Sequence, residues 1–355
     1  MMFENFNIDS NSKEAQILKS IIYDYIITGK PVGSRSFVQK YAFSISPATM
    51  RNIMSDLEKM GYLAQPHTSA GRLPTYKGYR FYVDSLLNDY NYDLNEELPG
   101  PDRQIKKELE LEDVFNSLLK MLSKESNYAS VMLTPKLDYT VVKRIELVPL
   151  DDNAILMVLV TRTGMIINKR ITLSTYITQE NLGKHSNYLT SELSGYSLFE
   201  IKNELLDKLR KDTKEKFKND FSEAEMAFDI AELAFGNIEE PRLEMQGIEN
   251  LLKIPEMVEQ KKINSLLQFI EKKEILADLM VEMLDKDGIF ALIGEELPYE
   301  DIVDCSMITT TYKIGTKKVG ALGVIGPTRM DYKKNVPLID YAGKLISDLL
   351  SKISK

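Results

Sequence analysis

The stretch from Ser46 to Asp84 constrains the fold of this chain more than any other. Ser46 followed by proline is a strong helix-start signal, because the hydroxyl caps free N–H groups and proline's missing N–H costs nothing at the first helical position. Gly61 ends this helix, a short strand follows, and residues 65–75 are rich in turn-forming residues. Thr75 then caps a further helix. The stretch therefore predicts a helix, a strand-loop-strand and a second helix.

Two further helices are predicted before this stretch. Asn11 or Ser12 caps a helix with apolar residues at helical spacing, and the sequence at 30–33 predicts a turn. Ser34 caps a short second helix that runs to about residue 41. Two helices, a tight connection and a third capped helix are typical of a helix-turn-helix, and the strand-loop-strand after them indicates a winged helix.

The predicted helix that begins at Ser46 divides into two faces. Met50, Ile53, Met54 and Leu57 recur at helical spacing and are expected in the core. The opposite face is short and polar, which suits base edges and phosphates in a DNA major groove. Its residues are Ala48, Arg51, Asn52, Ser55 and Lys59. A solvated face with no partner is the alternative interpretation, and the predicted wing favours DNA.

The charge distribution agrees with a polyanion partner for this part of the chain. Between Lys30 and Arg80 there are eight basic and two acidic residues, a net charge of +6. The whole chain carries −8, so the remainder carries −14. This asymmetry predicts one segment that meets nucleic acid and a larger body that does not.

The rest of the chain, after residue 88, is predicted to form a sheet, then helices, then a second set of strands. Proline and glycine at 99–101 indicate a linker over residues 89–104. A helix is predicted near 105–123, strands at 141–148, 154–161 and 165–173, helical patterns from 178 to 284, strands at 289–293 and 319–325, and a closing helix at 337–353. The order indicates a multidomain α+β protein with an antiparallel sheet and a mainly helical insertion.

Composition limits the possible chemistry. The single cysteine, Cys305, and two histidines, His67 and His185, leave no disulfide framework and disfavour a zinc site, although carboxylate-only magnesium or calcium sites stay open. The longest apolar run, residues 154–160, is far too short to span a membrane, and no secretory signal is recognised at residues 1–10. We expect a cytoplasmic protein.

No motif indicates catalysis. Cys305 lies between an aspartate and a serine, but a lone cysteine beside apolar runs is more often a small buried side chain than a nucleophile. Residues 320–327, GALGVIGP, lack the lysine of a phosphate-binding loop and lie in a strand pattern, so close backbone packing is the better interpretation. The acidic residues around 295–304 read as a solvated loop. We expect no enzymatic activity and no cofactor.

Several phrases of the sequence resemble one family. GKPVGSR at 29–35, SPATMRN at 46–52 and QPHTSAGR at 65–72 are similar to the heat-inducible transcription repressor family HrcA. The resemblance continues to Asp84 and returns in DCS at 304–306 and GALGVIGPTRMDY at 320–332. It therefore brackets nearly the whole chain.

The resemblance implies a three-part architecture. Residues 1–88 are expected to form a winged helix-turn-helix, and residues 89–104 a linker. A GAF-like α/β domain is expected in two parts, 105–185 and 285–355, with a dimerisation domain inserted at 186–284.

The resemblance also implies a function. Such proteins repress chaperone operons by binding an inverted-repeat operator (CIRCE) as homodimers, and the chaperonin GroEL promotes their DNA-binding form. Arg51 and Asn52 are expected at base edges, since arginine pairs well with guanine and asparagine with adenine. The expected phosphate or minor-groove contacts are Ser34, Arg35, Ser46, Thr49, Lys59, His67, Thr68, Ser69 and Arg72. A metabolite-responsive winged-helix regulator and an enzyme with a fused DNA-binding domain remain alternatives.

Overall fold

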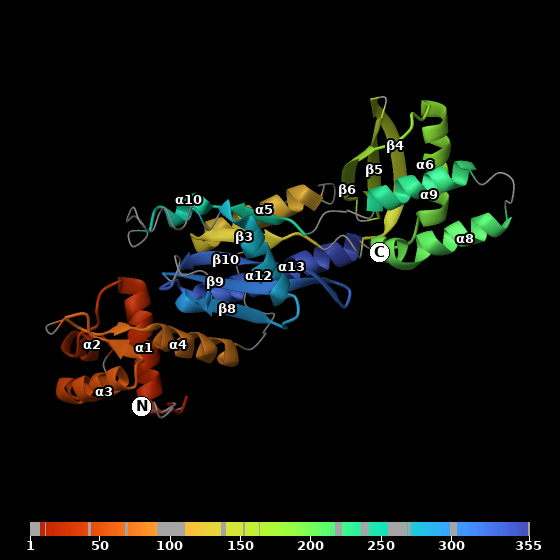
Figure 1. Ribbon diagram of the computed structural model, residues 1–355. Coiled ribbons are helices and arrows are strands. Elements are labelled where there is room, and N and C mark those ends of the chain that lie inside the picture. The colour runs from red at the N-terminus through yellow and green to blue at the C-terminus, as the bar shows by residue number, and fades with distance from the viewer. Residues whose placement is uncertain are drawn as a thin grey trace, which may run out of the picture.

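The computed structural model of the 355-residue chain describes residues 8–10, 12–41, 44–67, 70–90, 111–135, 140–151, 153–162, 164–216, 222–235, 241–254, 268, 271–298 and 304–353. Two predicted wing residues, Thr68 and Ser69, and most of the predicted linker lie outside these ranges. The described elements form three packing units along an elongated molecule (Figure 1). No helix among them is long and apolar enough to cross a membrane.

The N-terminal unit consists of helices around a very short sheet. Its elements are α1 (Lys13–Thr28), α2 (Ser34–Tyr41), α3 (Pro47–Lys59), β1 (Leu63–Ala64), β2 (Leu73–Pro74) and α4 (Tyr76–Asp89). Strands β1 and β2 pair antiparallel, and main-chain hydrogen bonds of 2.7 and 2.9 Å join Val32 to Arg72 at the base of the hairpin. The predicted order of helix, strand, strand and helix between residues 46 and 84 is confirmed.

Side-chain caps explain where these helices begin. The hydroxyls of Ser12, Ser46 and Thr75 accept hydrogen bonds at 3.1–3.2 Å from the backbone N–H three residues ahead. Each cap occupies one of the N–H groups that the first turn of a helix leaves without a partner. Gly29, with φ of 65°, ends α1 in the left-handed conformation that glycine tolerates.

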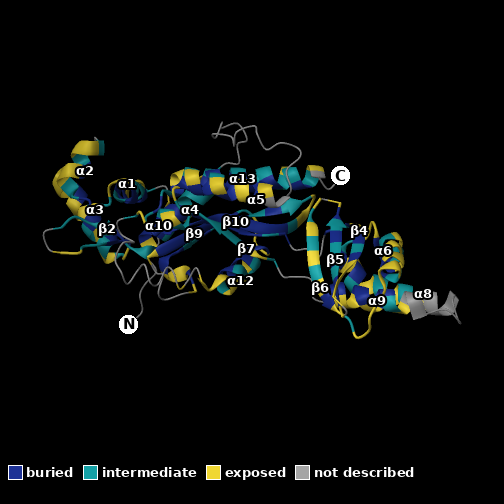
Figure 2. Cartoon of the chain, turned by 90° about the horizontal axis from the view of Figure 1, so that it is seen from above, coloured by how far each residue is buried: buried dark blue, intermediate teal, exposed yellow. Residues whose placement is uncertain are grey.

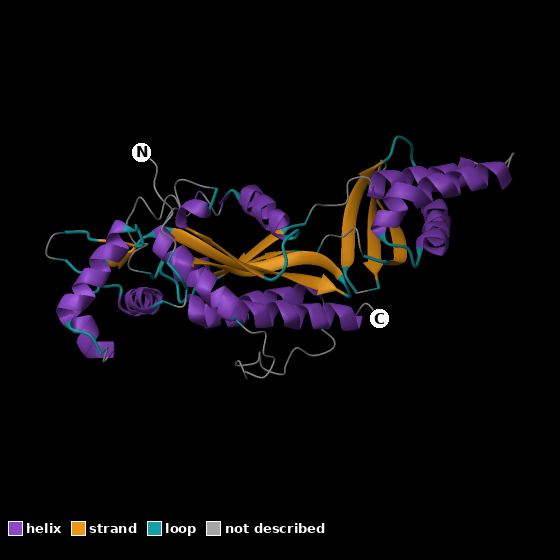
Figure 3. Ribbon diagram, turned by 90° about the horizontal axis from the view of Figure 1, so that it is seen from below, coloured by secondary structure: helices purple, strands orange, loops and turns teal. Residues whose placement is uncertain are grey.

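The central unit is a five-stranded antiparallel sheet with helices on both faces (Figure 3). The strand order is β7-β3-β10-β9-β8, from β3 (Ala129–Leu133), β7 (Leu243–Gln246), β8 (Ile289–Ile293), β9 (Cys305–Ile314) and β10 (Lys317–Pro327). One face packs against α5 (Leu111–Ser126) and α13 (Tyr332–Ile353). The other face packs against α10 (Ile248–Leu251) and α12 (Lys273–Met283).

Glycines let strand β10 lie unusually close to its neighbours. A Cβ atom on Gly323 would lie 2.1 Å from the Ile308 carbonyl oxygen, and one on Gly320 would lie 2.2 Å from the Tyr312 hydroxyl. The predicted interpretation of residues 320–327 as a closely packed strand is confirmed. Cys305, at the start of β9, is buried, as expected of a small core side chain.

The third unit contains a three-stranded antiparallel sheet and its own helices. Its elements are β4 (Val142–Asp151), β5 (Ala154–Thr161), β6 (Ile166–Thr172), α6 (Gln179–Leu193), α7 (Leu198–Glu200), the π-helical turn η2 (Ile201–Leu205), α8 (Leu206–Lys216) and α9 (Ser222–Phe235). Helices α6 and α9 contribute to one apolar core with one face of this sheet. Figure 2 shows the buried residues of this unit between the sheet and the helices.

This grouping differs from the predicted domain boundaries. Strands β4 to β6 were expected in the first part of the GAF-like domain, 105–185, yet they share a core with the helices that follow them. Conversely β7, α10 and α12 were expected in the insertion at 186–284, yet they pack on the five-stranded sheet. The packing therefore divides the chain near residue 141 and again near residue 241. Strand periodicity predicts the strands themselves but not the sheet that each one joins.

Some elements also differ from their predicted bounds. Helix α13 begins at Tyr332 rather than at Pro337, because the Asp331 side chain accepts the Lys334 N–H at 3.1 Å and caps the helix earlier. Helix α12 covers 273–283 of the predicted 263–284, and residues 263–267, 269 and 270 of that prediction lie outside the described ranges. Strands β3 and β9 were not predicted.

Candidate nucleic-acid interface

Helix α3 is divided into a buried and an exposed face. Met50, Met54 and Leu57 are buried in the core of the N-terminal unit. Burial of such a side chain stabilises by about 1.5–3 kcal/mol, so this face anchors the helix. On the other side the exposed residues are Ala48, Thr49, Arg51, Asn52 and Lys59, with Ser55 half-buried. The structure thus brings the predicted polar face together on one surface.

The first turn of α3 is capped by the Ser46 side chain and faces solvent. The Ser46 hydroxyl accepts the Thr49 N–H at 3.1 Å and lies 2.9 Å from the Thr49 hydroxyl. Both residues are exposed. A helix N-terminus carries partial positive charge and suits a phosphate oxygen. Ser46 and Thr49 therefore have a structural role in the cap in addition to their predicted role in DNA contact.

A groove of about 690 Å³ lies between α2, α3 and the hairpin. Its lining brings together four predicted residues from three separate segments: Ser34, Arg35, Arg51 and Arg72. Gln39 and Gln65 also line it and were not predicted as site residues. Their signal in the sequence is weak, because an isolated glutamine does not show which surface it will face.

The hairpin is fixed to α3 by an ion pair. Arg72 is only 16% exposed and its guanidinium lies 2.8 Å from the Glu58 carboxylate. This geometry gives Arg72 a structural role that the sequence did not predict, and its expected DNA contact stays a prediction. His67 is exposed near the tip of the hairpin.

Many of the basic residues counted in the sequence already have partners. Asp24 accepts a hydrogen bond from Lys40, which raises the pKa of Lys40. The Lys59 amine lies 2.9 Å from Asp56, and Lys77 donates to the Met60 carbonyl at the end of α3. Arg35 and Arg51 are exposed, and no ion pair involves either of them within the described ranges. These two arginines are the charges best placed to meet DNA.

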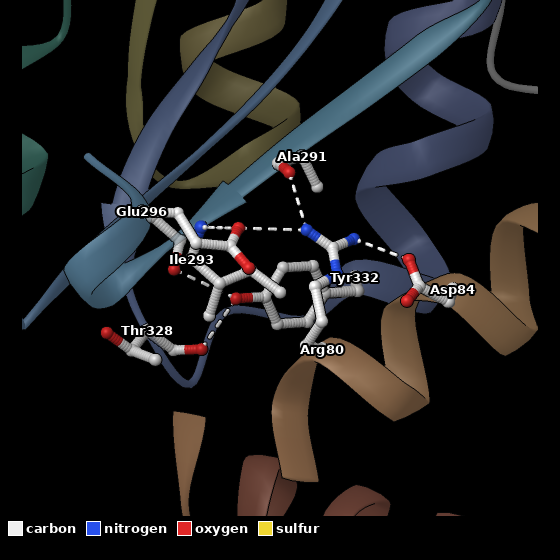
Figure 4. A network of polar contacts seen from close by, with 8 residues as sticks. Arg80, Asp84, Ala291, Ile293, Glu296, Thr328 and Tyr332 are labelled. Atoms are coloured by element: carbon white, nitrogen blue, oxygen red, sulfur yellow. Dashed lines mark hydrogen bonds and ion pairs between the residues drawn. The ribbon is translucent and has the colours of Figure 1, made fainter. Parts of the chain in front are cut away.

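The N-terminal unit is attached to the central sheet through Arg80 on α4 (Figure 4). The Arg80 guanidinium donates to the carbonyl of Ala291, within β8, at 2.8 Å and pairs with Glu296, in the turn after β8, at 2.9 Å. It also pairs with Asp84, one turn along α4, at 2.9 Å. The sequence places Arg80 only in a basic segment, because its two partners in the central unit, Ala291 and Glu296, lie more than 200 residues away.

A second contact joins α1 to the turn before α13. Arg329 donates to the Ile26 carbonyl at 2.8 Å. Tyr332 lies behind this turn, fully buried, and its hydroxyl donates to the Thr328 carbonyl at 2.7 Å. Burial raises the pKa of Tyr332 well above its ordinary value, so the hydroxyl stays protonated and keeps this bond at physiological pH.

A pocket of about 470 Å³ lies at the same junction. Ile26 and Ile27 from α1 line one side, and Tyr128, Lys253 and Arg329 from the central unit line another. The rest of the lining includes apolar residues, two asparagines and the Asp331 carboxylate. The two cations outnumber the one carboxylate, so the pocket suits a small molecule that has an apolar body and an anionic group.

Other candidate chemistry finds little support in the described residues. No group of three metal-ligating side chains occurs among them. Cys305 is buried in the sheet, and His185 is buried on α6 in the third unit, so the two belong to different cores.

Comparison with known proteins identifies the relatives of this chain. The family described as HrcA protein C terminal domain matches residues 112–336. The heat-inducible transcription repressor HrcA of Natranaerobius thermophilus is 36% identical over 342 residues, 96% of this chain and 97% of that protein. The same repressor of Geobacter sulfurreducens is 37% identical over 342 residues, 96% of this chain and 98% of its own length.

A crystal structure titled as that of a hypothetical protein is similar in fold. It aligns with a TM-score of 0.64 and 24% sequence identity over 97% of this chain and 99% of its own. The fold, the exposed polar helix and these relatives place the chain in the class of transcription repressors. Within that class, the chain belongs to the HrcA family of heat-inducible transcription repressors.

Proposed function

We propose that this protein is a cytoplasmic, sequence-specific DNA-binding repressor of chaperone operons that binds an inverted-repeat operator (CIRCE) as a homodimer. The observation that carries the proposal is the exposed face of α3, where Arg51 and Asn52 lie beside a groove lined by Arg35. A helix with a short polar exposed face and a capped N-terminus matches the dimensions and donors that a major groove accepts.

In this proposal the N-terminal unit is a winged helix-turn-helix that contacts DNA in two ways. Arg51 and Asn52 read base edges, since both side chains form paired hydrogen bonds to a purine. The phosphate and minor-groove contacts come from Ser34, Arg35, Ser46, Thr49, Lys59 and the wing residues His67, Thr68, Ser69 and Arg72. Phosphate contacts fix the register, and base contacts supply the specificity.

The third unit is proposed as the inserted dimerisation domain, and the central unit as the GAF-like domain. Support comes from the sheet face of the third unit that points away from α6 and α9. Val148 and Ile166 on this face are 44% and 50% exposed. Leu156, Val158 and Val160 lie between them on β5 and are half-buried. These five side chains form an apolar strip, and Arg144, Glu146, Asn168 and Arg170 lie beside it on the same face. An apolar strip in contact with water and rimmed by polar residues marks an interface, and a second copy of this face would cover it.

The chaperonin GroEL is proposed to promote the DNA-binding form. The support is family membership. A partner that binds only one form of a protein shifts the population toward that form by mass action. When heat-unfolded proteins occupy the chaperonin, the repressor loses that support and repression is relieved.

A footprint on a promoter probe with an inverted repeat tests the proposal. We expect protection of two half-sites related by two-fold symmetry, with affinity that falls steeply as salt is raised. Addition of GroEL should strengthen protection, and Arg51→Ala should weaken it on the same probe. Absence of a protected two-fold site at low salt, with or without chaperonin, would contradict the repressor proposal.

The pocket at the junction supports a second candidate, a metabolite-responsive winged-helix regulator. Its position between α1 and the central unit would let a small amphipathic anion act on the placement of the N-terminal unit. Thermal unfolding in the presence of metabolite pools, compared with chaperonin, separates the two candidates. A rise in melting temperature with a metabolite, lost in Lys253→Glu, supports the second; a rise only with chaperonin supports the first.

A further inference from the structure

The contacts between the N-terminal unit and the central sheet leave the polar face of α3 uncovered. They involve α1 and α4, whereas Ala48, Arg51 and Asn52 on α3 remain exposed. Docking of the N-terminal unit therefore does not block the proposed DNA-reading surface. It fixes the direction in which that surface points.

The Arg80 contact is built from groups that are already held in place. Glu296 Oε2 accepts the Ile293 N–H at 2.9 Å, so the carboxylate is oriented by the end of β8 before it meets Arg80. Arg80 in turn is held on α4 by Asp84. A guanidinium is planar and presents its N–H groups in fixed directions, so a bond to both the Ala291 carbonyl and Glu296 sets an angle as well as a distance.

The Arg329 contact fixes a second point on a different helix. Arg329 lies in the turn between β10 and α13, and its bond to the Ile26 carbonyl reaches the last turn of α1. This turn is supported from behind by the buried Tyr332, which bonds to Thr328 and whose ring lies 6.4 Å from that of Tyr79 on α4. Two anchored points on two helices prevent the unit from pivoting about either one.

Apolar packing joins the same surfaces. Tyr79, Tyr82 and Val83 of α4 belong to one continuous buried cluster with Ile289 and Tyr332 of the central unit. Apolar burial supplies adhesion without direction. The two arginine contacts supply the direction.

We propose that Arg80, Glu296 and Arg329 are positioning residues that fix each DNA-reading helix to the body and so set the half-site spacing that the dimer accepts. The inference rests on the proposed function, in which two copies meet two half-sites. With rigid units, only one separation of half-sites lets both helices enter their major grooves. With units that pivot, the second half-site is reached over a range of separations, and spacing is no longer discriminated.

The test measures affinity for a series of inverted-repeat probes. The spacer is lengthened one base pair at a time through about one helical turn of about 10 base pairs, and a single half-site probe is included. The wild-type protein should bind best at one spacing and lose about tenfold or more when the spacer changes by half a turn. In Arg80→Gln and Arg329→Gln the same change should cost no more than about twofold. Affinity for the single half-site should be unchanged, because neither side chain lies on the exposed face of α3.

Control variants make the result specific. Arg210→Gln removes an arginine that pairs with Asp229 and Glu232 in the third unit, and it should leave spacing discrimination intact. Arg80→Gln combined with Glu296→Gln should lose no more discrimination than Arg80→Gln alone, since the first change already removes the Arg80–Glu296 contact.

Each outcome decides a separate claim. If wild type binds none of the probes, with or without GroEL, the proposed repressor function fails. If wild type binds but does not discriminate spacing, or if Arg80→Gln and Arg329→Gln discriminate as sharply as wild type, the inference is overturned. It is also overturned if both variants lose affinity equally for every probe, since that indicates a damaged N-terminal unit. Arg80 and Arg329 lie on different elements. If one of the two variants does not fold, the spacing series measured on the other still tests the inference.

Discussion

Arg51 and Lys59 lie on the same exposed face of α3 but are proposed to contact different parts of DNA. Arg51→Ala should cost about 1–3 kcal/mol at one base position and relax specificity there. Lys59→Ala should weaken binding to all sequences alike and reduce the salt dependence by about one charge. Both effects are measured by binding titrations over a set of single-base operator variants at several salt concentrations. If Arg51→Ala weakened all sequences equally, its assignment to base reading would be wrong.

Gly323 provides a test of the close approach between β10 and β9. Gly323→Ala introduces a Cβ that would meet the Ile308 carbonyl oxygen at 2.1 Å, a backbone atom that cannot turn aside. We expect a loss of about 1–3 kcal/mol in the free energy of unfolding. The matched control is Gly183→Ala on α6, where a Cβ meets no atom within 4 Å. That change should stabilise by about 0.5–1 kcal/mol, because alanine favours helix over glycine. Urea unfolding of both variants checks the prediction, and equal loss in the two would contradict it.

The sequence predicted the burial or exposure of a residue correctly where the pattern within one helix or strand determines it. The two faces of α3 follow from helical periodicity, and the buried state of Cys305 follows from its apolar neighbours. The sequence did not predict the partners of Arg72 and Arg80. An ion pair between residues 216 positions apart depends on the tertiary fold, which no local pattern contains.

At the scale of elements, variants of the Ser46 cap on α3 distinguish its contribution to helix stability from its proposed contact with DNA. Ser46→Ala removes the acceptor for the Thr49 N–H and should lower the free energy of unfolding by about 1 kcal/mol. Ser46→Asp keeps an acceptor at the cap and should preserve stability. The added negative charge should nevertheless weaken DNA binding, because phosphate is expected at this helix end.

Thermal unfolding and operator binding measured on the same preparations check this prediction. Asparagine at position 46 serves as the control, since it caps as well as aspartate without the charge. Full DNA affinity in Ser46→Asp would remove Ser46 from the proposed phosphate contacts.

Most elements were predicted because their periodicity and caps are local. Helices α1 and α3 begin at predicted caps, and β4 to β6 pair antiparallel as expected. Strand β9 was missed because its centre is rich in threonine, which is polar. It is nevertheless an inner strand of the sheet, between β10 and β8, and is buried on both faces. Burial on both sides removes the alternation on which strand prediction depends.

At the scale of the whole molecule, the apolar face of the third unit makes a prediction about assembly. Val158→Lys places a charge on the middle strand of the face formed by β4, β5 and β6. Glu146 lies opposite this position on β4, but a dimer would bury both charges, and burial of charged side chains is costly even as a pair. We expect the proposed dimer to dissociate while each chain stays folded. Asn187→Lys introduces the same side chain at an exposed position on α6 and should leave the dimer intact. Sedimentation measures the assembly and circular dichroism the fold, and a dimeric Val158→Lys protein would contradict this choice of interface.

The division into units was the least predictable property. The sequence indicated sheet, helices and sheet, and this order holds along the chain. It did not show that β4 to β6 leave the central sheet, since sheet membership depends on which apolar faces meet after folding. Boundaries near residues 141 and 241 follow from the shared cores, not from any change in composition.

The buried position of Cys305 allows thiol labelling to measure how often heat opens the central sheet. It is the one thiol in 355 residues, and it lies buried in β9 of the central sheet. A thiol reagent can therefore react only when this sheet opens, and the labelling rate at rising temperature measures how often it does. If heat relieves repression by opening the body, labelling and loss of operator binding should rise over the same temperature range. If operator binding is lost while the thiol stays protected, the heat-sensitive step lies outside the sheet.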